Sequence, residues 1–199
     1  PATGLSSSTG SPVSANPTST TSYTITGTDA NGCYNTGSCS VLVNQLPNVS
    51  VNSGAICSGA TTLLNALGAN TYAWSPATGL SSSTGASVAS SPAATTTYVV
   101  TGTDLNGCSN TDTAIVTVNP LPVVNVDPQN ATGCAPVCVT FSNTSSATGN
   151  CSWNFGDGFV STNCAPYHCY TVQGYYNAML TLTDGNGCVG SDSATVVVY

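Results

Sequence analysis

Cationic side chains are missing from this sequence. Its 199 residues include no Lys and no Arg, and its seven acidic residues are all Asp, so the formal net charge is −7. Proteins that bind nucleic acid or anionic membrane surfaces use Lys and Arg to neutralise phosphate groups. We therefore expect no nucleic-acid partner, no attraction to anionic lipid and no salt bridges between side chains.

Long apolar runs and strong helix formers are also scarce. No run approaches the roughly 20 apolar residues that a membrane-spanning helix needs, so we expect no membrane insertion. Ser, Thr, Gly, Asn and Val dominate instead, a composition typical of an all-β protein. Hydrophobic residues still make up 40% of the chain. Alternating runs such as residues 113–119 supply faces to bury, which argues against disorder.

Groups that perform catalysis or bind metals are few. His168 is the only histidine, and the cysteines are widely spaced, without the C-x-x-C pairs of zinc sites. The motifs of serine hydrolases and phosphate-binding loops are absent, and a Ser-His-Asp match arises easily by chance in a chain so rich in serine. We therefore expect no enzyme activity and no cofactor.

The sequence repeats itself. Three segments recur at a constant offset of 75 residues (76 − 1, 101 − 26 and 121 − 46), and a third copy of the motif T-D-x-N-G-C ends at Cys188. The recurring pairs are residues 1–10 and 76–85, 26–33 and 101–108, and 46–51 and 121–126. A constant offset indicates tandem modules. We divide the chain into the C-terminal half of one module (1–46), a complete module (47–121) and a diverged third module (122–199).

Short strands separated by Gly, Asn, Asp and Pro turns are predicted along the complete module. Their number and spacing indicate a two-sheet, immunoglobulin-like β-sandwich with Trp74 as its core aromatic residue. Leu-Pro pairs at residues 46–47 and 121–122 should stiffen the joints, which predicts a semi-rigid rod. The expected strands are residues 48–52, 61–67, 71–75, 96–104 and 111–119, with a hairpin turn at 104–107.

Ten cysteines in small modules indicate an oxidising environment, so the protein is expected to be secreted, extracellular or on the cell surface. The complete module contains only Cys57 and Cys108. Closing the 51-residue loop between them (108 − 57) would contribute roughly 4 kcal/mol in the chain-entropy model. Cys134 and Cys188 occupy the matching places in the third module. The sequence therefore predicts the disulfides Cys57–Cys108 and Cys134–Cys188.

Four further cysteines lie in the third module. Strand alternation in residues 137–141 places Cys138 on the outer face, and alternation around Cys169 does the same. A Cys138–Cys169 bridge is therefore favoured, which leaves Cys151–Cys164. Four cysteines allow three pairings, and this one is our prediction.

The first half-module contains Cys33 and Cys39. Cys33 matches Cys108, but the position that matches Cys57 would fall before residue 1, and Cys39 matches no cysteine in the second copy. Six extended residues span roughly 20 Å, whereas the Cα atoms of a disulfide lie about 6 Å apart. A Cys33–Cys39 bridge would therefore need a bulge, and the partners of both cysteines stay open.

Two groups of residues give the third module a family resemblance. They follow the pattern W-x-F-G-D-G, then P-x-H-x-Y, then G-x-Y-x-x-x-L. The matching residues are Trp153, Phe155, Gly156, Asp157, Gly158, Pro166, His168, Tyr170, Gly174, Tyr176 and Leu180. Residues 123–199 thus resemble the PKD domain, an immunoglobulin-like module. The resemblance implies that His168 is a structural residue of the sandwich.

Asp157 has two interpretations. Some PKD domains bind calcium, so the resemblance implies a calcium ligand as one of them. The other is a turn aspartate that caps its own loop, which we favour because no second acidic residue lies nearby in the sequence. Asp29 and Asp104, in the motifs D-A-N-G and D-L-N-G, are interpreted as turn formers on the same grounds.

Residues 1–122, with their S-P-A-T-G-L-S and T-G-T-D-x-N-G-C motifs, are similar to Ser/Thr-rich repeats found beside PKD domains in secreted surface proteins of Bacteroidota. The resemblance implies non-catalytic parts of stalks, adhesins and filaments. Residues 112–114 (D-T-A) and 192–194 (D-S-A) are similar to the O-glycosylation signal of those bacteria, which would place glycans on Thr113 and Ser193. Alternatively, both tripeptides merely begin the last strand.

A half-module would leave strand edges and core uncovered. Either the chain is an excerpt from a longer polymeric protein, which is the simpler interpretation, or a strand from a neighbouring copy completes the half-module. Both interpretations imply copies of the chain in a linear polymer. Glycans would supply the solubility that charged side chains usually give.

The function expected from these features is structural. The array would form part of an extracellular filament, sheath or surface stalk, stabilised by disulfides and glycosylated. The alternative is an adhesin or carbohydrate-binding spacer in a secreted multidomain protein, which aromatic residues grouped on one exposed face would favour. Tyr175 and Tyr176 are the only adjacent aromatic pair, and at least one should lie in the core.

Overall fold

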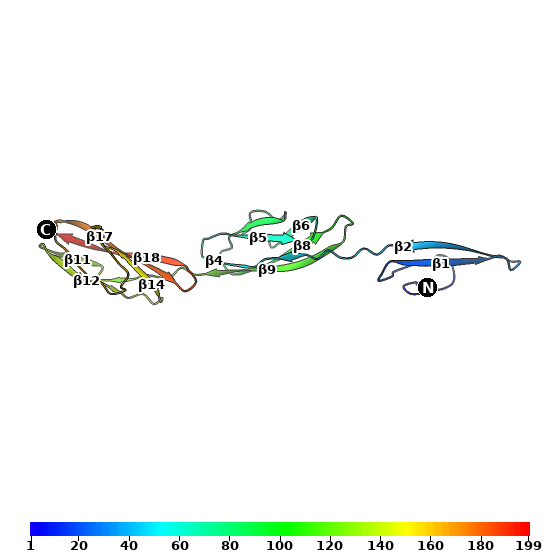
Figure 1. The fold of residues 1–199 in the computed structure, drawn as a ribbon, viewed down its shortest axis with the longest axis horizontal. Coiled ribbons are helices and arrows are strands. Elements are labelled where there is room, and N and C mark those ends of the chain that lie inside the picture. Colours follow the sequence, from blue (N-terminus) through cyan, green and yellow to red (C-terminus); the bar gives the residue numbers. More distant parts are fainter.

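The computed structural model describes residues 1–199 as an extended all-β rod (Figure 1). Three parts follow one another along its long axis. We keep the bounds expected from the sequence for them and call them the first unit (residues 1–46), the middle module (47–121) and the third module (122–199). The tip of the first unit forms one end of the rod, and the C-terminus lies at the other. Separate cores fill the middle and third modules. No helix in the structure is long and apolar enough to span a bilayer.

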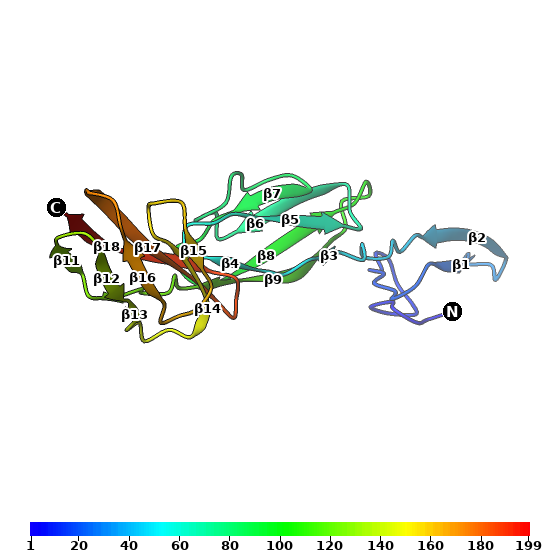
Figure 2. The same cartoon turned by 60° about the vertical axis from the view of Figure 1, so that its left-hand side comes forward.

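The middle module is a sandwich of two sheets. One sheet has the strand order β4-β9-β8-β6 and the other β3-β5-β7. Strand β4 runs parallel to β9, and the other neighbours are antiparallel. Figure 2 shows β5 and β7 in one layer and β8 and β9 in the other. The strands are β3 (Ser50–Val51), β4 (Gly54–Cys57), β5 (Thr62–Leu67), β6 (Thr71–Ser75), β7 (Ser87–Ser90), β8 (Thr96–Thr103) and β9 (Ser109–Asn119).

Alternating side chains fill the core of the middle module, as the period of a β-strand requires. Tyr98 and Val100 point inward from β8 and are fully buried, and Leu64 of β5 faces them from the second sheet. Trp74 is 4% exposed, and its Nε1 donates a hydrogen bond of 2.8 Å to the carbonyl oxygen of Gly85. Trp74 is therefore a core residue, as predicted, but it shares the core with two further aromatic residues, Tyr98 and Tyr72.

All five strands expected in the middle module are present, although the first extends only over Ser50–Val51. Strands β4 and β7 were not predicted. Each is four residues long and contributes a single buried apolar side chain, Ile56 or Val88. A strand of four residues is too short to show a clear two-residue period, so the sequence gives almost no signal for it.

The third module is a sandwich with a larger main sheet. Its five strands have the order β11-β18-β17-β14-β15, and the pairs β12-β16 and β10-β13 complete the fold. Strand β11 runs parallel to β18, as β4 does to β9. The strands are β10 (Val126–Asp127), β11 (Asn130–Gly133), β12 (Val137–Thr140), β13 (Ser142–Asn143), β14 (Gly149–Asn154), β15 (Val160–Ser161), β16 (Tyr167–Tyr170), β17 (Gly174–Asp184) and β18 (Val189–Val198).

An aromatic cluster forms the centre of the third module. Phe141 and Trp153 lie with ring centroids 5.1 Å apart, and Trp153 and Phe155 stack at 6.1 Å. Each of the three side chains is at most 2% exposed. Close offset packing of aromatic rings adds to the free energy gained by burying their surface.

The first unit consists of the antiparallel strands β1 (Thr21–Thr28) and β2 (Tyr34–Val41), with residues 1–20 folded beside them (Figure 1). One tyrosine hydrogen bond of the middle module recurs in it. The Tyr23 hydroxyl donates to the Thr3 carbonyl oxygen over 2.8 Å, as the Tyr98 hydroxyl does to Thr78 over 2.9 Å. The first unit therefore folds as the matching half of the middle module does.

Side chains of the first unit that match core residues of the middle module are exposed. Ile25 matches Val100, yet its exposed fraction is 59% whereas Val100 is fully buried. Cys39 is exposed although it matches the fully buried Ala114. Both side chains line an open groove where the first strands of a complete module would pack.

Two aspartate side chains on the last strand of their module accept a hydrogen bond from the backbone of the first strand. The Val51 N–H donates to Asp112 Oδ2 over 2.9 Å, and the Val126 N–H donates to Asp192 Oδ2 over 3.0 Å. Gln129 Nε2 donates to the same oxygen of Asp192 over 2.9 Å. Burial raises the pKa of Asp192, but the hydrogen bonds from Gln129 and the backbone lower it more, so the net pKa lies below the ordinary value.

Replacing Asp192 by Asn should therefore destabilise the third module at neutral pH. Hydrogen bonds to a charged group are worth about 1.5–3 kcal/mol, and we expect a loss near the lower figure because Asn keeps one acceptor. Since the folded-state pKa is depressed, the stabilisation is complete above the unfolded-state pKa and is lost as the pH falls through the folded-state pKa. Chemical denaturation of the Asp192→Asn variant across acidic pH tests this. A stability difference that does not shrink with acid would contradict it.

Candidate functional site

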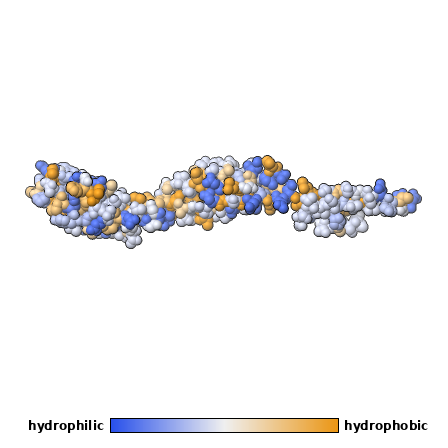
Figure 3. All heavy atoms as spheres, in the orientation of Figure 1, coloured by the Kyte–Doolittle hydropathy of each residue, from blue (hydrophilic) through white to orange (hydrophobic).

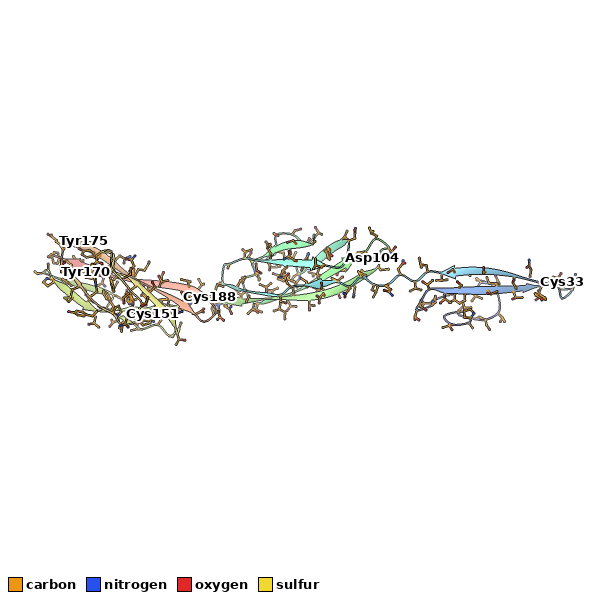
Figure 4. All side chains as sticks on the ribbon, viewed as in Figure 1. Cys33, Asp104, Cys151, Tyr170, Tyr175 and Cys188 are labelled. Atoms are coloured by element: carbon orange, nitrogen blue, oxygen red, sulfur yellow. A yellow bond between two sulfur atoms is a disulfide. The ribbon has the colours of Figure 1, made fainter.

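A disulfide joins two neighbouring modules. Cys57, at the end of β4 in the middle module, bonds to Cys188 in the β17–β18 hairpin of the third module, with their Cα atoms 5.5 Å apart. Cys188 is fully buried and Cys57 half-buried. Figure 4 shows Cys188 at the end of the third module that faces the middle module. The bond therefore locks the end of one module to the start of the next.

The cysteine-bearing hairpin is the same structure in all three parts. In the third module, Asp184 Oδ1 accepts hydrogen bonds from the N–H groups of Asn186 and Cys188, over 2.8 and 2.9 Å. The Asp184 N–H donates to the Cys188 carbonyl oxygen over 2.9 Å, and Gly187 takes a φ of 80°, which favours glycine. The Asp side chain thus closes a tight turn that presents the cysteine.

The other two hairpins repeat these contacts. Asp104 Oδ1 accepts from the Cys108 N–H over 2.9 Å, and Asp29 Oδ1 accepts from the Cys33 N–H over 2.8 Å. Figure 4 labels Asp104 where the middle module faces the first unit, and Cys33 at the far tip of the rod. Each hairpin therefore points toward whatever precedes its module. The interpretation of Asp29 and Asp104 as turn formers is confirmed.

The strand end that bears Cys57, the other partner in the disulfide between modules, also recurs in the third module, where it bears Cys134. Beyond Cys57, the Ser58 N–H donates to the Asn119 carbonyl oxygen over 2.8 Å, at the end of β9. Beyond Cys134, the Ala135 N–H donates to the Tyr199 carbonyl oxygen over 3.2 Å, just past β18. Cys57 and Cys134 therefore occupy equivalent places at the end of their module that faces forward along the rod.

The predicted disulfides Cys57–Cys108 and Cys134–Cys188 are absent from the structure, which pairs Cys57 with Cys188 and leaves Cys108 and Cys134 free. The physical reason is distance. Cys108 precedes β9, whereas Cys57 pairs with Asn119 at the opposite end of that 11-residue strand. At about 3.3 Å per residue the two cysteines are separated by roughly 36 Å. A disulfide accommodates Cα atoms only about 4.4–6.8 Å apart.

The two disulfides within the third module are those that the sequence favoured. Cys138 and Cys169 lie opposite each other on β12 and β16 and are bonded, and Cys151 is bonded to Cys164. Both bonds lie within one module. Cys33 and Cys39 are both free and exposed.

The linker between the middle and third modules approaches β18 closely. A Cβ added at Gly190 would fall on the carbonyl oxygen of Pro122. At the junction with the first unit, Asn110 takes the place of Gly190, and its Nδ2 donates to the carbonyl oxygen of Pro47 over 3.1 Å. The linker thus touches the same strand position at both junctions.

His168 belongs to the aromatic core of the third module. Its ring stacks on Phe155 at 4.2 Å and meets Tyr170 edge-on at 4.7 Å. His168 Nε2 lies 2.7 Å from Asp157 Oδ2, the one contact with ion-pair geometry in a chain where none was expected. Burial is the largest cause that raises the pKa of Tyr170, and Asp157 and Tyr176 add to it, which keeps this phenol protonated. The site supports a structural role for His168.

Asp157 is engaged on both oxygens. Oδ1 accepts a hydrogen bond of 3.1 Å from the Phe159 N–H, which closes the turn, while Oδ2 contacts His168. No group of three or more His, Cys, Asp or Glu side chains gathers in the structure. These contacts fit the interpretation of Asp157 as a turn residue.

The two residues considered for glycosylation differ in exposure. Thr113 is exposed on β9, whereas Ser193 is half-buried on β18. Asp112 and Asp192, which precede them, hold strands in place as described above. Of the two hydroxyls, that of Thr113 is therefore the more accessible.

Four aromatic side chains of the third module are exposed: Phe159, Tyr167, Tyr175 and Tyr199. Tyr175 is 82% exposed, and Tyr176 packs against the core as expected of one member of the pair. Tyr167 is also exposed, but it lies on β16, which belongs to a different sheet from the β17 strand that bears Tyr175. On the face drawn in Figure 3, hydrophobic residues form small separate patches.

The pairing can be tested by counting thiols. Alkylation of the unreduced monomer should label Cys33, Cys39, Cys108 and Cys134, because the other six cysteines are in disulfides. Pairing within each module would leave only the first two. Intact mass and peptide mapping with a protease that cuts at Asp give the answer, since a chain without Lys and Arg resists trypsin. Protection of Cys108 and Cys134 would contradict the structure.

The close linker contact predicts that Gly190→Ala destabilises the third module. Because the added Cβ has to displace Pro122, we expect a loss of about 1–3 kcal/mol. Gly185→Ala is the matched control, since nothing lies within 4 Å of its added Cβ. Denaturation can be followed by the fluorescence of Trp153 in a Trp74→Phe background. Equal stability of the two glycine variants would show that the linker is not held there.

Comparison with known proteins agrees with the third module's geometry. Residues 119–198 match the family model of the PKD domain. A microbial collagenase from Vibrio alginolyticus is 35% identical over 74 residues, which cover 35% of this chain and 9% of the collagenase. The resemblance of the third module to the PKD domain is confirmed. Its fold is typical of accessory modules that are not themselves catalytic.

Solved structures with similar folds include parts of two bacterial proteins. The PKD1 domain of the Vibrio cholerae metalloprotease PrtV is 30% identical, with a TM-score of 0.34, and the match covers 39% of this chain and 96% of that domain. A Ca²⁺-stabilised adhesin that helps an Antarctic bacterium bind ice is 14% identical with a TM-score of 0.45, and covers 91% of this chain and 57% of the adhesin.

Proposed function

We propose that this chain is a structural array: a stiff, disulfide-linked part of an extracellular filament, sheath or surface stalk. The observation that supports this most directly is the Cys57–Cys188 bond, because it joins two modules instead of stabilising one. An enzyme or a soluble binding module gains nothing obvious from such a bond. A rod that must keep its length and direction under load gains stiffness from such a bond.

The composition supports the same function. With no Lys or Arg, the chain resists proteases that cut after those residues. Its surface of hydroxyls and amides can pack closely, since little charge has to be desolvated when two surfaces meet. Three disulfides fit an extracellular location. Glycans on Thr113, the more exposed of the two candidate sites, would add solubility.

A second candidate function is a spacer in a secreted multidomain protein. It is favoured by the match of residues 119–198 to the PKD domain and by the similarity to a short part of a collagenase. The chain spans 9% of that relative, so a similar array could separate a catalytic or adhesive part from its anchor. Both candidates use the chain as a rod, and they differ in what the rod connects.

Small-angle X-ray scattering tests the rod itself. The oxidised monomer should scatter as the extended shape of Figure 1 predicts. Replacing Cys57 and Cys188 by Ser should lower the radius of gyration and broaden the distance distribution, because only the linker then holds the joint.

The matched control is the double variant Cys138→Ser, Cys169→Ser, which removes a disulfide within one module. It should leave the radius of gyration unchanged. If the Cys57, Cys188 variant scatters like the native chain, the disulfide does not stiffen the rod and the structural function loses its main support. Electron microscopy of native material would then separate the two candidates, since a filament shows an axial repeat and a spacer shows single rods.

A further inference from the structure

We propose that the Cys57–Cys188 disulfide carries tension past the cores of the middle and third modules, so that this part of the rod hardly lengthens when it is pulled. The bond divides the chain into a short covalent route along the rod and a closed loop with a sequence separation of 131 residues. The inference goes beyond the proposed function, which concerns the stiffness of the joint and not the path of a force. It holds for any force that enters the chain before Cys57 and leaves it after Cys188.

The first part of this route lies beside β9 and is already extended. The Asn110 side chain near the start of β9 donates to the Pro47 carbonyl oxygen over 3.1 Å, and Cys57 lies opposite Asn119 at the end of the strand. The nine steps of β9 between these contacts (119 − 110) cover roughly 30 Å. The ten steps from Pro47 to Cys57 (57 − 47) can span at most roughly 33–36 Å. This segment therefore has almost no slack.

The second part of the route is β18. It leads from Cys188 to Tyr199, and eleven steps of strand (199 − 188) cover roughly 36 Å. Strands β9 and β18 follow each other along the rod (Figure 1). With the cysteine Cα atoms 5.5 Å apart, the route from Pro47 to Tyr199 measures roughly 70 Å when folded and at most about 80 Å when stretched. Tension can therefore lengthen it by only about 10 Å.

Without the bond between modules, the same force would act on the two sandwiches. Single modules are marginally stable, so tension that opens one would release its chain. Only the Cys138–Cys169 bond, with a sequence separation of 31, would then shorten the path. The remaining 121 steps between Pro47 and Tyr199 (199 − 47 − 31) can span roughly 400–440 Å. The disulfide between modules therefore reduces the possible length about fivefold.

Most of the folded material lies in the loop and not on the route. The buried side chains Leu64, Tyr98 and Trp153 belong to the loop. Both disulfides within the third module also lie in it, because all four of their cysteines fall between residues 57 and 188. The two cores thus keep the rod straight, while the covalent route bears the tension.

Single-molecule force spectroscopy of the full-length chain tests this route. The chain is held at its first and last residues between marker domains of known length, without reductant. The native route has 67 steps (199 − 1 − 131), so the stretched length should be roughly 220–250 Å. We expect the first unit to unravel and no unfolding peaks from the other two modules.

Replacing Cys57 and Cys188 by Ser should add 100 steps (131 − 31), or roughly 330–360 Å, released in separate unfolding peaks. The final length depends only on the covalent route, so a variant that folds poorly still gives a valid result. The matched control is the double variant Cys138→Ser, Cys169→Ser with the bond between modules intact. Its stretched length should equal that of the native chain, because its loop lies within the bypassed segment.

A native chain that stretches as far as the Cys57, Cys188 variant would overturn the inference, and so would a control that is longer than the native chain. Pairing within modules, Cys57–Cys108 and Cys134–Cys188, would also overturn it and is recognised by its own length. That pairing leaves 93 steps (198 − 51 − 54), or roughly 310–330 Å. Scattering measures stiffness without tension, so a rod that is stiff in solution but stretches fully would contradict this inference alone. A flexible rod of short stretched length would contradict the proposed function alone.

Discussion

The covalent contact between consecutive modules is the constraint on which the rest of the structure depends. A chain without Lys and Arg cannot use salt bridges between Lys or Arg and Asp to strengthen the contact between consecutive modules. A disulfide needs neither area nor charge, and salt does not screen it. Closing a loop with a sequence separation of 131 residues is worth about 5 kcal/mol in the chain-entropy model. Cys57 and Cys188 thus supply a covalent link between the middle and third modules.

The junction gives the rod a direction. The middle and third modules each present a hairpin cysteine at the rear and a second cysteine at the front, because β9 and β18 run the whole length of their module between the two places. The bond can form only between the front of one module and the rear of the next. A disulfide within one module would have stabilised that module alone, and the joint would have remained a flexible linker.

The first unit and the third module show what the sandwich needs. The first unit has the hairpin, the turn and the tyrosine contact of a complete module, yet Ile25 is 59% exposed because no second sheet covers it. The third module has a full aromatic core around Trp153 and two disulfides of its own. Local structure therefore forms from a few residues, whereas burial requires both sheets.

Much of this could be predicted from the sequence because it depends on local chemistry. The offset of 75 residues defines the modules, alternation places Tyr98 and Val100 in the core, and the motif D-x-N-G-C specifies the turn. Alternation also suggested the Cys138–Cys169 bridge, since both partners lie on adjacent strands and face outward.

The partner of Cys57 was decided only by the tertiary structure. Equal numbers of cysteines in equivalent places are compatible with pairing within modules or between them, and the repeat cannot distinguish the two. The length of β9 decides it, because it places Cys108 and Cys57 at opposite ends of the module. The sequence by itself determined the repeat, the longer strands of the middle module and the turns that present the hairpin cysteines. Which ends of those strands meet depends on how the modules follow one another in space, and a disulfide forms only where that arrangement brings two sulfur atoms together.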